Sequence, residues 1–461
     1  MGIEYLGLSN INGPLVILEG VQDAFFDEIV EFTVDGKTKK IGRIIELYED
    51  KAVIQVFEGT ENMSLDNTRT KLTGHLMEVS LAPDMLGRTF NGIGKPIDGL
   101  GPLITDVKRD VNGLPLNPVR RKYPRNYIRT GISAIDGLTT LIRGQKLPIF
   151  SGNGLPHDQL AAQIVKQASL GDGSDEPFAV VFGAMGVKHD VADFFQKTFE
   201  ESGVADHVCM FLNLANDPVV ERLITPKVAL TAAEYLAFDC NMHILVILTD
   251  MTSFAEAMRE VSSSKGEIPS RKGYPGYLYS ELATLYERAG IIEGAEGSVT
   301  QLPILTMPND DITHPIPDLT GYITEGQIVL DRNLNGQSIY PPISVLPSLS
   351  RLMKDGIGEG YTRKDHQDLA NQLFSAYAKV GEARNLASVI GEDELSPIDK
   401  KYLEFGKAFE ERYIGQGLEE NRSMIETLDL GWELLKILPR EELDRIDTKI
   451  IDKYLPKEQE S

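Results

Sequence analysis

Apolar positions near the N-terminus form short runs rich in valine and isoleucine, separated by turn clusters such as Asp35-Gly36 and Glu49-Asp50-Lys51. Closely spaced strands with this punctuation are typical of a small closed barrel. A loop-rich stretch, Asn91–Pro102, follows this region. The expected strands of the barrel are Leu15–Leu18, Glu28–Val34, Ile41–Leu47 and Val53–Phe57.

From about Thr130 to Arg351, apolar strands alternate with amphipathic helices. This alternation predicts a parallel sheet with helices on both of its faces. The expected strands are Leu147–Phe150, Ala179–Phe182, Val208–Leu212, Met242–Leu248 and Ile304–Met307, and the expected helices include Gln159–Ser169, Asp190–Ser202 and Pro226–Phe238.

Beyond Arg351 the strand pattern ends and only helical spacing remains, in Asp365–Val380, Pro397–Tyr413 and Met424–Leu435. The length of 461 residues also suits about three domains. We therefore predict an α/β chain with three parts: an N-terminal β-barrel over residues 1–75, a P-loop-NTPase-like parallel sheet with flanking helices over 76–355, and a C-terminal helical domain over 356–461.

Composition and charge narrow the classes of partner. The formal net charge is −23, and nucleic-acid binding requires a basic face, so a nucleic-acid partner is not expected. The same charge disfavours direct docking on anionic lipid. The longest apolar run, near Ile244–Leu248, is far too short to cross a bilayer, and no signal peptide is visible. Any membrane association is therefore expected to come through other proteins.

Cysteine and histidine usage points to a cytoplasmic chain without a metal centre. Cys209 and Cys240 are the only cysteines, and both stand in apolar surroundings, which suits buried thiols in a reducing cytosol. The histidines are dispersed, and none shows a metal-ligand spacing with a cysteine.

The segment Ser151–Asp158 stands where a phosphate-binding loop belongs, after an apolar strand and before an amphipathic helix. Against the pattern G-x-x-x-x-G-K-[ST], Ser151 replaces the first glycine, Pro156 the second, His157 the lysine and Asp158 the hydroxyl residue. The intervening residues are Gly152, Asn153, Gly154 and Leu155. On their own, these eight residues would also pass as an ordinary turn.

These replacements predict weak or no nucleotide binding at this loop. Pro156 offers no backbone N–H, and His157 is mostly neutral at pH 7. A carboxylate at Asp158, about 4 Å from a phosphate at an effective dielectric of about 20, would repel it by roughly 4 kcal/mol. Asp158 is instead expected to cap the following helix and to fill the anion site with the protein's own charge.

Further segments occur in a characteristic order around this loop: Thr130–Leu138, Arg143–Lys146, Thr249-Asp250, Gly326–Asp331 and Pro341–Arg351. Together they resemble the nucleotide-binding subunits of rotary ATPases, and more narrowly the non-catalytic B subunit of a V/A-type (vacuolar-type) ATPase. The resemblance covers nearly the whole chain. Its most specific marks are Gly154–His157 and Leu346–Arg351, whereas Ser344 departs from the Asn or Asp usual in the signature.

The resemblance implies that a second catalytic group is also missing. In the catalytic relatives a Gly-Glu-Arg sequence follows the strand that here runs into Gly183-Ala184-Met185, and its glutamate orients the attacking water. Ala184 can neither accept a proton nor position water. Losing both this glutamate and the loop lysine is hard to reconcile with turnover at the chain's own site.

Two further residues have two interpretations each. Asp250 matches the magnesium-side aspartate of the relatives, but it could equally cap the helix expected to start near Ser253. Arg351 matches the arginine finger, because a forked, permanently charged guanidinium suits a γ-phosphate across a subunit boundary. The alternative is a surface arginine paired with an acidic neighbour.

The segment Asp393–Asp399 resembles the acidic loop with which rotary ATPase subunits press on a central shaft. Ser396 and Pro397 also form a helix cap and a first helical position, so a plain junction between a loop and a helix is an equally good interpretation.

By resemblance, three copies of this chain would alternate with three catalytic A subunits around central stalk subunits, with a peripheral stalk outside. ATP or ADP with Mg²⁺ would bind at these interfaces, mainly in the A subunit, while Arg351 acts in trans. The chain is not expected to be catalytic alone or to hold nucleotide tightly. The alternatives are a self-standing nucleotide hydrolase with a divergent loop and a pure scaffold subunit.

Overall fold

The computed structural model describes residues 3–113, 116–171 and 175–455. It forms two compact units, each built from segments that are distant in sequence. The first unit comprises Met1–Pro118, Ala179–Arg288 and Ala295–Gly297, and the second comprises Val119–Phe178, Ala289–Gly294 and Ser298–Ser461. Within the described residues, every helix is too short or too polar to cross a membrane.

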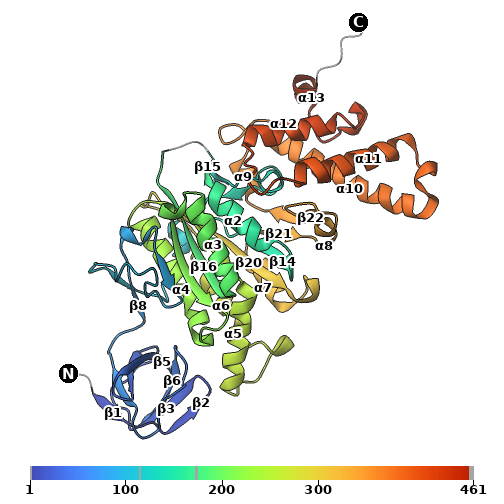
Figure 1. Ribbon diagram of the computed structural model, residues 1–461. Helices are drawn as coiled ribbons and strands as arrows, with labels where there is room; N and C mark the ends of the chain where they lie inside the picture. The colour runs from blue at the N-terminus through green and yellow to red at the C-terminus, as the bar shows by residue number, and fades with distance from the viewer. Residues whose placement is uncertain (1–2, 114–115, 172–174, 456–461) are drawn as a thin grey trace. The chain divides into compact units, whose positions relative to one another are not determined.

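The first unit begins with the β-barrel, a seven-stranded antiparallel sheet that curls on itself (Figure 1). The strand order is β1-β7-β4-β5-β6-β3-β2. Inward-facing side chains such as Val30, Phe32, Ile44 and Ile54 are fully buried, as the alternation along each strand requires. The strands are β1 (Glu4–Leu6), β2 (Asn10–Asn12), β3 (Leu15–Glu19), β4 (Ile29–Val34), β5 (Thr38–Tyr48), β6 (Lys51–Val56) and β7 (Arg69–Leu72).

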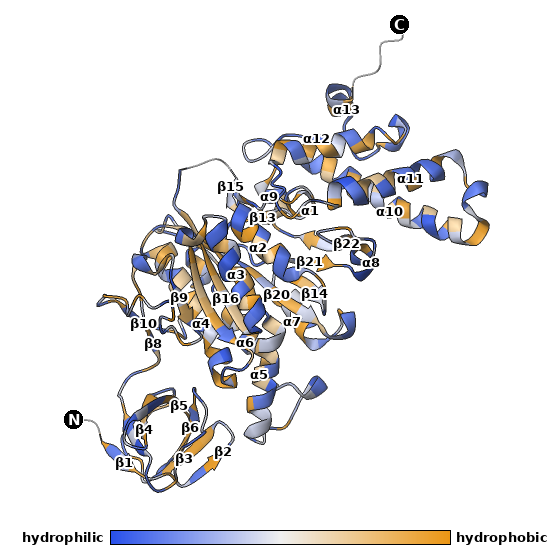
Figure 2. Cartoon of the chain, viewed as in Figure 1, coloured by the Kyte–Doolittle hydropathy of each residue, from blue (hydrophilic) through white to orange (hydrophobic). Residues whose placement is uncertain are grey.

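The rest of the first unit is a parallel sheet covered by helices. Strands β9 (Thr89–Asn91), β16 (Phe178–Val187), β17 (Val208–Leu214) and β18 (His243–Thr249) lie in the order β18-β16-β17-β9. Every residue of β18 is buried, because a central parallel strand has packing on both faces. Figure 2 shows the same hydrophobic character in β16. The remaining elements are β8 (Glu78–Ser80), β10 (Lys108–Asp110), α3 (His189–Glu201), α4 (Val219–Phe238), α5 (Met251–Ser264) and α6 (Leu278–Tyr286).

In the second unit, β14 (Ile149–Gly152) lies between two parallel neighbours, β20 (Ser298–Met307) and β21 (Gly326–Leu330). Strand β22 (Ile343–Ser350) pairs with β21 in the antiparallel direction. The shorter strands are β11 (Arg121–Lys122), β12 (Tyr127–Arg129), β13 (Leu141–Ile142), β15 (Ser169–Leu170) and β19 (Gly290–Ile292). The accompanying helices are α1 (Ser133–Asp136), α2 (His157–Gln167), α7 (Pro315–Ile323), α8 (Arg332–Gly336) and α9 (Met353–Gly356).

The chain after α9 is helical, with amphipathic helices whose apolar faces meet in one core (Figure 2). Phe405, Phe409 and Tyr413 stack along one side of this core, with ring centroids 5.5 and 5.0 Å apart. The helices are α10 (His366–Ile390), α11 (Pro397–Ala408), a π-helical turn Phe409–Ile414 that continues α11, α12 (Met424–Leu435) and α13 (Thr448–Tyr454).

The predicted fold class is confirmed: a β-barrel, a parallel sheet with helices and a helical C-terminal part are all present. The two largest differences from the expected helix bounds are in α4 and α10. Helix α4 starts at Val219 and contains Pro226 in its interior, because nearly all of α4 is buried and packing compensates for the lost hydrogen bond. Helix α10 continues ten residues past Val380, through a mixed segment in which helix formers such as Glu382, Ala383 and Leu386 alternate with poorer ones.

Candidate functional site

The loop Ser151–Asp158 connects β14 directly to α2. Ser151 and Gly152 are buried at the end of the strand, whereas Asn153 and Gly154 are exposed. The strand ends two residues later than expected, and the helix starts two residues earlier, at His157. The loop therefore has the position of a phosphate-binding loop in a strand–loop–helix unit.

The polar groups of this loop contact one another. The Leu155 N–H donates to Gly152 O at 3.1 Å, and the His157 N–H donates to Leu155 O at 2.9 Å. The Ser151 hydroxyl lies 2.9 Å from His157 Nδ1, and His157 Nε2 lies 3.6 Å from Asp158 Oδ1. Pro156 supplies no N–H at all. Two backbone N–H groups of the loop, those of Leu155 and His157, are thus used internally.

The expected helix cap at Asp158 is wrong. Pro156 occupies the cap position without a side-chain hydrogen bond, and Asp158 is already the second residue of α2. A capping side chain must come from the extended residue before the helix, and Asp158 has helical backbone instead. Its carboxylate nevertheless lies in the first turn, where a negative charge interacts favourably with the helix dipole.

An ion pair that the sequence reasoning missed covers the other side of the loop. Arg332 Nε and Nη2 donate to Asp310 at 2.6 and 2.9 Å, and Nη2 also donates to Asn153 O at 2.9 Å. The Arg332 hydrogen bonds hold the pKa of the Asp310 carboxyl below its usual range. An added Cβ at Gly152 would displace the Asp310 carboxylate and the Arg332 guanidinium, which lie directly over this residue. The loop is therefore enclosed on this side by charged groups that neutralise each other.

Arg351 follows β22 and has an exposed side chain. Its N–H donates to Glu325 O at 2.9 Å, and its Nη1 donates to Thr324 O at 3.2 Å. Across the described ranges of the chain, no carboxylate lies within ion-pair distance of this guanidinium. The acidic neighbour of the alternative interpretation is thus not found, and most of the hydrogen-bonding capacity of Arg351 points to solvent.

Asp250 caps a helix. Its side chain accepts from the Thr252 N–H at 2.8 Å, at the start of α5. The helix begins at Met251 rather than near Ser253. One oxygen of this carboxylate therefore has a structural role in the first unit.

Ala184 lies inside β16, fully buried. The strand continues three residues beyond it, to Val187. A buried methyl group in this position has no acid–base chemistry.

The segment from Thr130 to Gly137 is tied together by a buried carboxylate. Asp136 accepts from the Thr130 N–H and hydroxyl at 2.9 and 2.7 Å and from the Gly131 N–H at 2.9 Å. Burial raises the pKa of Asp136 to about 6. At the end of the segment, His366 Nε2 lies 3.0 Å from Gly137 O, and burial lowers the pKa of this histidine to about 4.

The acidic segment Asp393–Asp399 joins α10 to α11. Ser396 caps α11, accepting from the Asp399 N–H at 3.2 Å, with Pro397 as the first helical residue. Exposed apolar side chains, Val389 at 81% and Ile390 at 44% exposure, lie beside the acidic residues. The junction between loop and helix is present, and its tip combines apolar and acidic surface.

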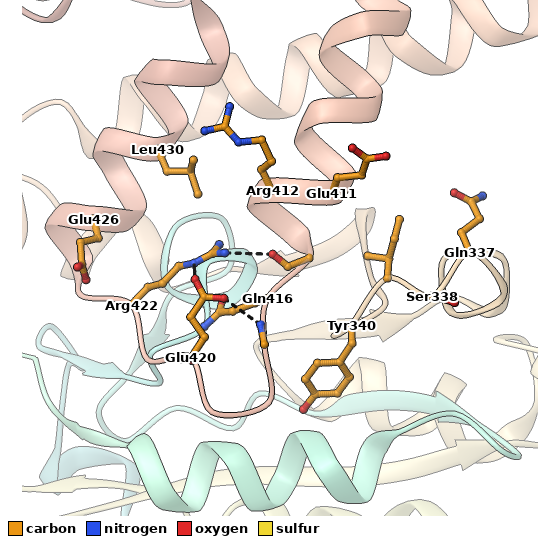
Figure 3. Close-up of a pocket in the computed structure, with 13 residues that line it drawn as sticks. Gln337, Ser338, Tyr340, Glu411, Arg412, Gln416, Glu420, Arg422, Glu426 and Leu430 are labelled. Carbon is orange, nitrogen blue, oxygen red and sulfur yellow. Dashed lines mark hydrogen bonds and ion pairs between the residues drawn. The ribbon is translucent and has the colours of Figure 1, made fainter.

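A polar pocket of about 730 Å³ lies in the second unit between the α8–β22 connection, the π-helical turn and α12 (Figure 3). Its arginines are already paired: Arg422 with Glu420 at 2.6 Å and Arg412 with Glu433 at 2.7 Å. Gln416 donates to Gly131 O at 2.6 Å, so the pocket wall is joined to the Thr130–Gly137 segment. Figure 3 shows Arg422, Glu420 and Gln416 close together on this wall.

A metal ion has no obvious protein site in the described part of the chain, where groups of three or more His, Cys, Asp or Glu suited to hold one do not occur.

Family models match the three regions in order. The ATP synthase alpha/beta family beta-barrel domain matches residues 8–74, the nucleotide-binding domain of the same family matches 131–350, and the C-terminal domain of V and A type ATP synthase matches 355–455. These matches define the class of protein: a nucleotide-binding ATP synthase subunit of the alpha/beta type.

Individual relatives narrow this class. The chain is 64% identical over 453 residues to the V-type ATP synthase beta chain 2 of Clostridium tetani, covering 98% of each chain. It is 63% identical over 451 residues to the V-type ATP synthase beta chain of Halothermothrix orenii, covering 98% of this chain and 97% of that one. A solved ATP synthase subunit, NeqB from Nanoarcheaum equitans, superposes with a TM-score of 0.72 at 39% identity, over 92% of this chain and 98% of that one.

The chain belongs to the V-type ATP synthase beta chain family, in agreement with the resemblance expected from its motifs.

Proposed function

We propose that this chain is the non-catalytic, B-type subunit of a V/A-type rotary ATPase and supplies Arg351 in trans to the ATP site of a neighbouring catalytic subunit. The observation that carries the proposal is the state of Arg351: exposed, fixed through its backbone to the end of a strand pair, and without a carboxylate partner among the described residues. In a chain with a net charge of −23, a free guanidinium of this kind is well suited to contact an anion on another molecule.

The loop Ser151–Asp158 supports the non-catalytic part of the proposal. Its donors are used internally, Asp158 adds a negative charge, and Ala184 offers no base. ATP or ADP with Mg²⁺ would then bind at the subunit interface, mainly on the catalytic neighbour. Residual nucleotide binding by this chain alone would be weak at the loop, and Asp250 would act as a helix cap.

The proposed assembly has three copies of this chain alternating with three catalytic A subunits, together with central and peripheral stalk subunits. It would lie in the cytoplasm, peripheral to the membrane. The tip around Val389 and Asp393 would face the central stalk, where its acidic residues suit a basic partner surface. In this scheme we retain three functional domains, residues 1–75, 76–355 and 356–461.

The test is ATP hydrolysis by the reconstituted complex with Arg351→Ala. An arginine finger is typically worth about 10³–10⁵ in rate, so hydrolysis should fall by that order while the complex still assembles. Arg351→Lys should recover only a small part of the rate, because a lysine lacks the bidentate fork.

Arg445→Ala is the matched control, since Arg445 is also an exposed arginine and, among the residues that the structure describes, forms its ion pair with its neighbour Asp444. This variant should hydrolyse ATP at the normal rate. Unchanged turnover in Arg351→Ala would leave the chain a scaffold, and Mg²⁺-dependent hydrolysis by the purified chain alone would favour a self-standing hydrolase.

A further inference from the structure

The segment Arg143–Lys146 lies shortly before β14. Its side chains are polar, yet they are buried. Gln145 is fully buried, and Lys146 is only 4% exposed. Burying an amide or an ammonium group is costly unless its polar atoms find partners. The partners of these two residues therefore indicate what the segment does.

The Gln145 side chain connects three backbone segments. Its Oε1 accepts from the Ile142 N–H at 2.9 Å, and its Nε2 donates to Glu325 O at 3.1 Å and to Ser350 Oγ at 2.8 Å. Ser350 is the residue directly before Arg351, and its hydroxyl donates to Thr140 O at 2.9 Å. Gln145 is thus bonded to Ser350, the residue whose backbone leads directly into Arg351.

Glu325 provides the second connection. Its backbone oxygen accepts from both Gln145 Nε2 and the Arg351 N–H. Its carboxylate pairs with Lys146 Nζ at 2.8 Å and accepts from the Lys146 N–H at 3.0 Å. One carbonyl oxygen, that of Glu325, thus joins the Gln145 side chain to the backbone of Arg351.

The strand pair around this carbonyl has little freedom. Gly326 lies opposite Ser350 in the β21–β22 ladder. It adopts φ +136°, and an added Cβ would collide with Leu349 O. The two strands therefore approach closely at the point where Arg351 leaves the sheet, and the Gln145 amide donates to both sides of this point, to Glu325 O and to Ser350 Oγ.

We propose that Gln145 is a positioning residue for Arg351: it holds Ser350 and Glu325 so that the guanidinium is presented at a fixed place and orientation. This inference rests on the proposed role of Arg351 in trans. Gln145 touches no substrate and acts only through the arginine. Because β14 starts four residues after Gln145, the same network links the position of Arg351 to the strand that leads into the loop Ser151–Asp158.

The test is Gln145→Leu in the reconstituted complex, with kcat and KM for ATP measured separately. Leucine has a similar volume but cannot donate to Ser350 or Glu325. A displacement of about 1 Å at a catalytic group can reduce the rate by about 10²-fold, so kcat should fall by about 10- to 100-fold while KM stays within about twofold. Ser350→Ala removes only one of the two acceptors and should give a smaller loss, whereas Ser350→Thr retains the hydroxyl and should recover the rate.

A matched control separates positioning from general packing. Gln372 is a buried glutamine that likewise donates to a backbone carbonyl, Glu442 O at 3.1 Å, and accepts from a backbone N–H, Arg445 at 2.9 Å. Gln372→Leu should leave kcat within about twofold. An equal loss of kcat in Gln372→Leu would overturn the inference, and so would a normal kcat in both Gln145→Leu and Ser350→Ala.

The double variant Arg351→Ala/Gln145→Leu distinguishes this inference from the proposed function. If Gln145 acts through Arg351, the double variant should be no slower than Arg351→Ala alone. A full further loss in the double variant overturns the positioning role while leaving the arginine finger intact. Normal hydrolysis by Arg351→Ala overturns the proposed function itself. If Gln145→Leu does not assemble, the same comparison is made with Ser350→Ala.

Discussion

The loop Ser151–Asp158 and the residue Arg351 belong to the same unit but treat their polar groups in opposite ways. In the loop, the Leu155 and His157 N–H groups donate to loop carbonyls, and Asn153 O accepts from Arg332, which is itself paired with Asp310. At Arg351 the backbone is held firmly, while the guanidinium keeps most of its donors free. The comparison shows that one unit can engage the polar groups of a loop internally and still leave a guanidinium exposed elsewhere.

Two arginines make the contrast sharper. Arg332 and Arg351 are both substantially exposed, so exposure alone does not separate them. Arg332 has a bidentate carboxylate partner, which satisfies its charge, whereas Arg351 donates only to a backbone carbonyl. We infer that the presence or absence of a carboxylate partner, rather than burial, determines which arginine is available to an external anion.

Beyond the Arg351→Ala test, the largest expected effect comes from reopening the loop. The variant Pro156→Gly/His157→Lys/Asp158→Thr restores an N–H, a fixed cation and a hydroxyl. Removing a repulsion of roughly 4 kcal/mol corresponds to about 10³ in affinity, so the isolated chain should bind Mg·ATP at least about 100-fold more tightly. A titration of labelled ATP with Mg²⁺ measures this gain.

Asp393→Thr is the control for the loss of the Asp158 carboxylate, since it also replaces an aspartate by threonine, but at the α10–α11 tip. It should leave ATP binding unchanged. If the triple variant binds ATP no better than the parent chain, Pro156, His157 and Asp158 are not what prevents nucleotide binding at the loop. The contrast drawn between the loop and Arg351 would then be wrong.

A smaller effect is expected at Asp250. Its carboxylate, like the polar groups of the loop, makes a hydrogen bond within the protein. Asp250→Ala should lower the free energy of unfolding by about 1 kcal/mol, the usual cost of losing a helix cap. Asp250→Asn keeps a capping oxygen and should unfold at nearly the parent temperature. Thermal unfolding of the three proteins checks this order, and equal stability of the alanine and parent chains would show that the cap contributes nothing.

The smallest effect is expected at Arg332. Both partners of its ion pair are about half exposed, so solvent screens the pair, and Arg332→Ala should cost less than about 1 kcal/mol of global stability. Loss of the hydrogen bond to Asn153 O should instead loosen the loop locally. Hydrogen exchange of the Leu155 and His157 amides should accelerate, while amides in β20 keep their protection. Unchanged exchange at these two positions would mean that Arg332 does not hold the loop.

Much of the fold follows from patterns in the sequence, because apolar periodicity and turn residues act locally. Four of the seven barrel strands, the alternation of strands and helices, and the start and end of α12 at Met424 and Leu435 were predicted, whereas the short strands β1, β2 and β7 were not. The place of the degenerate loop was predictable for the same reason, since it lies between an apolar strand and an amphipathic helix.

The groups around the loop were harder to predict. Asp310 and Arg332 are about 160 and 180 positions away from Gly152 in the sequence and meet it only because β14, β20 and β21 are parallel neighbours. A usable signal existed: both residues come shortly after a strand, and the carboxyl ends of parallel strands lie at one edge of a sheet. The bond from Gln145 to Ser350 left no comparable pattern, because it depends on the pairing of β21 with β22.

The cap expected at Asp158 failed for a local reason. The helix starts two residues earlier than the hydrophobic pattern indicates, so a residue expected before the helix lies within its first turn. Helix ends are set by backbone geometry within one or two residues, which composition does not resolve.

The buried pair at the two ends of the Thr130–Gly137 segment has a consequence for acid tolerance. Asp136, with its pKa raised to about 6, favours the folded chain most below its unfolded value and loses that contribution as pH rises through 6. His366, with its pKa lowered to about 4, does the reverse: its contribution is complete above about 6.5 and disappears as pH falls toward 4. Each pKa shift corresponds to roughly 3 kcal/mol of folding free energy. In mildly acidic solution the two contributions change in opposite directions and offset each other. The stability of this part of the protein therefore depends little on pH in this range. Replacing His366 by glutamine removes one of the two opposing contributions, so that variant should become more stable as the medium is acidified from pH 7 to 5.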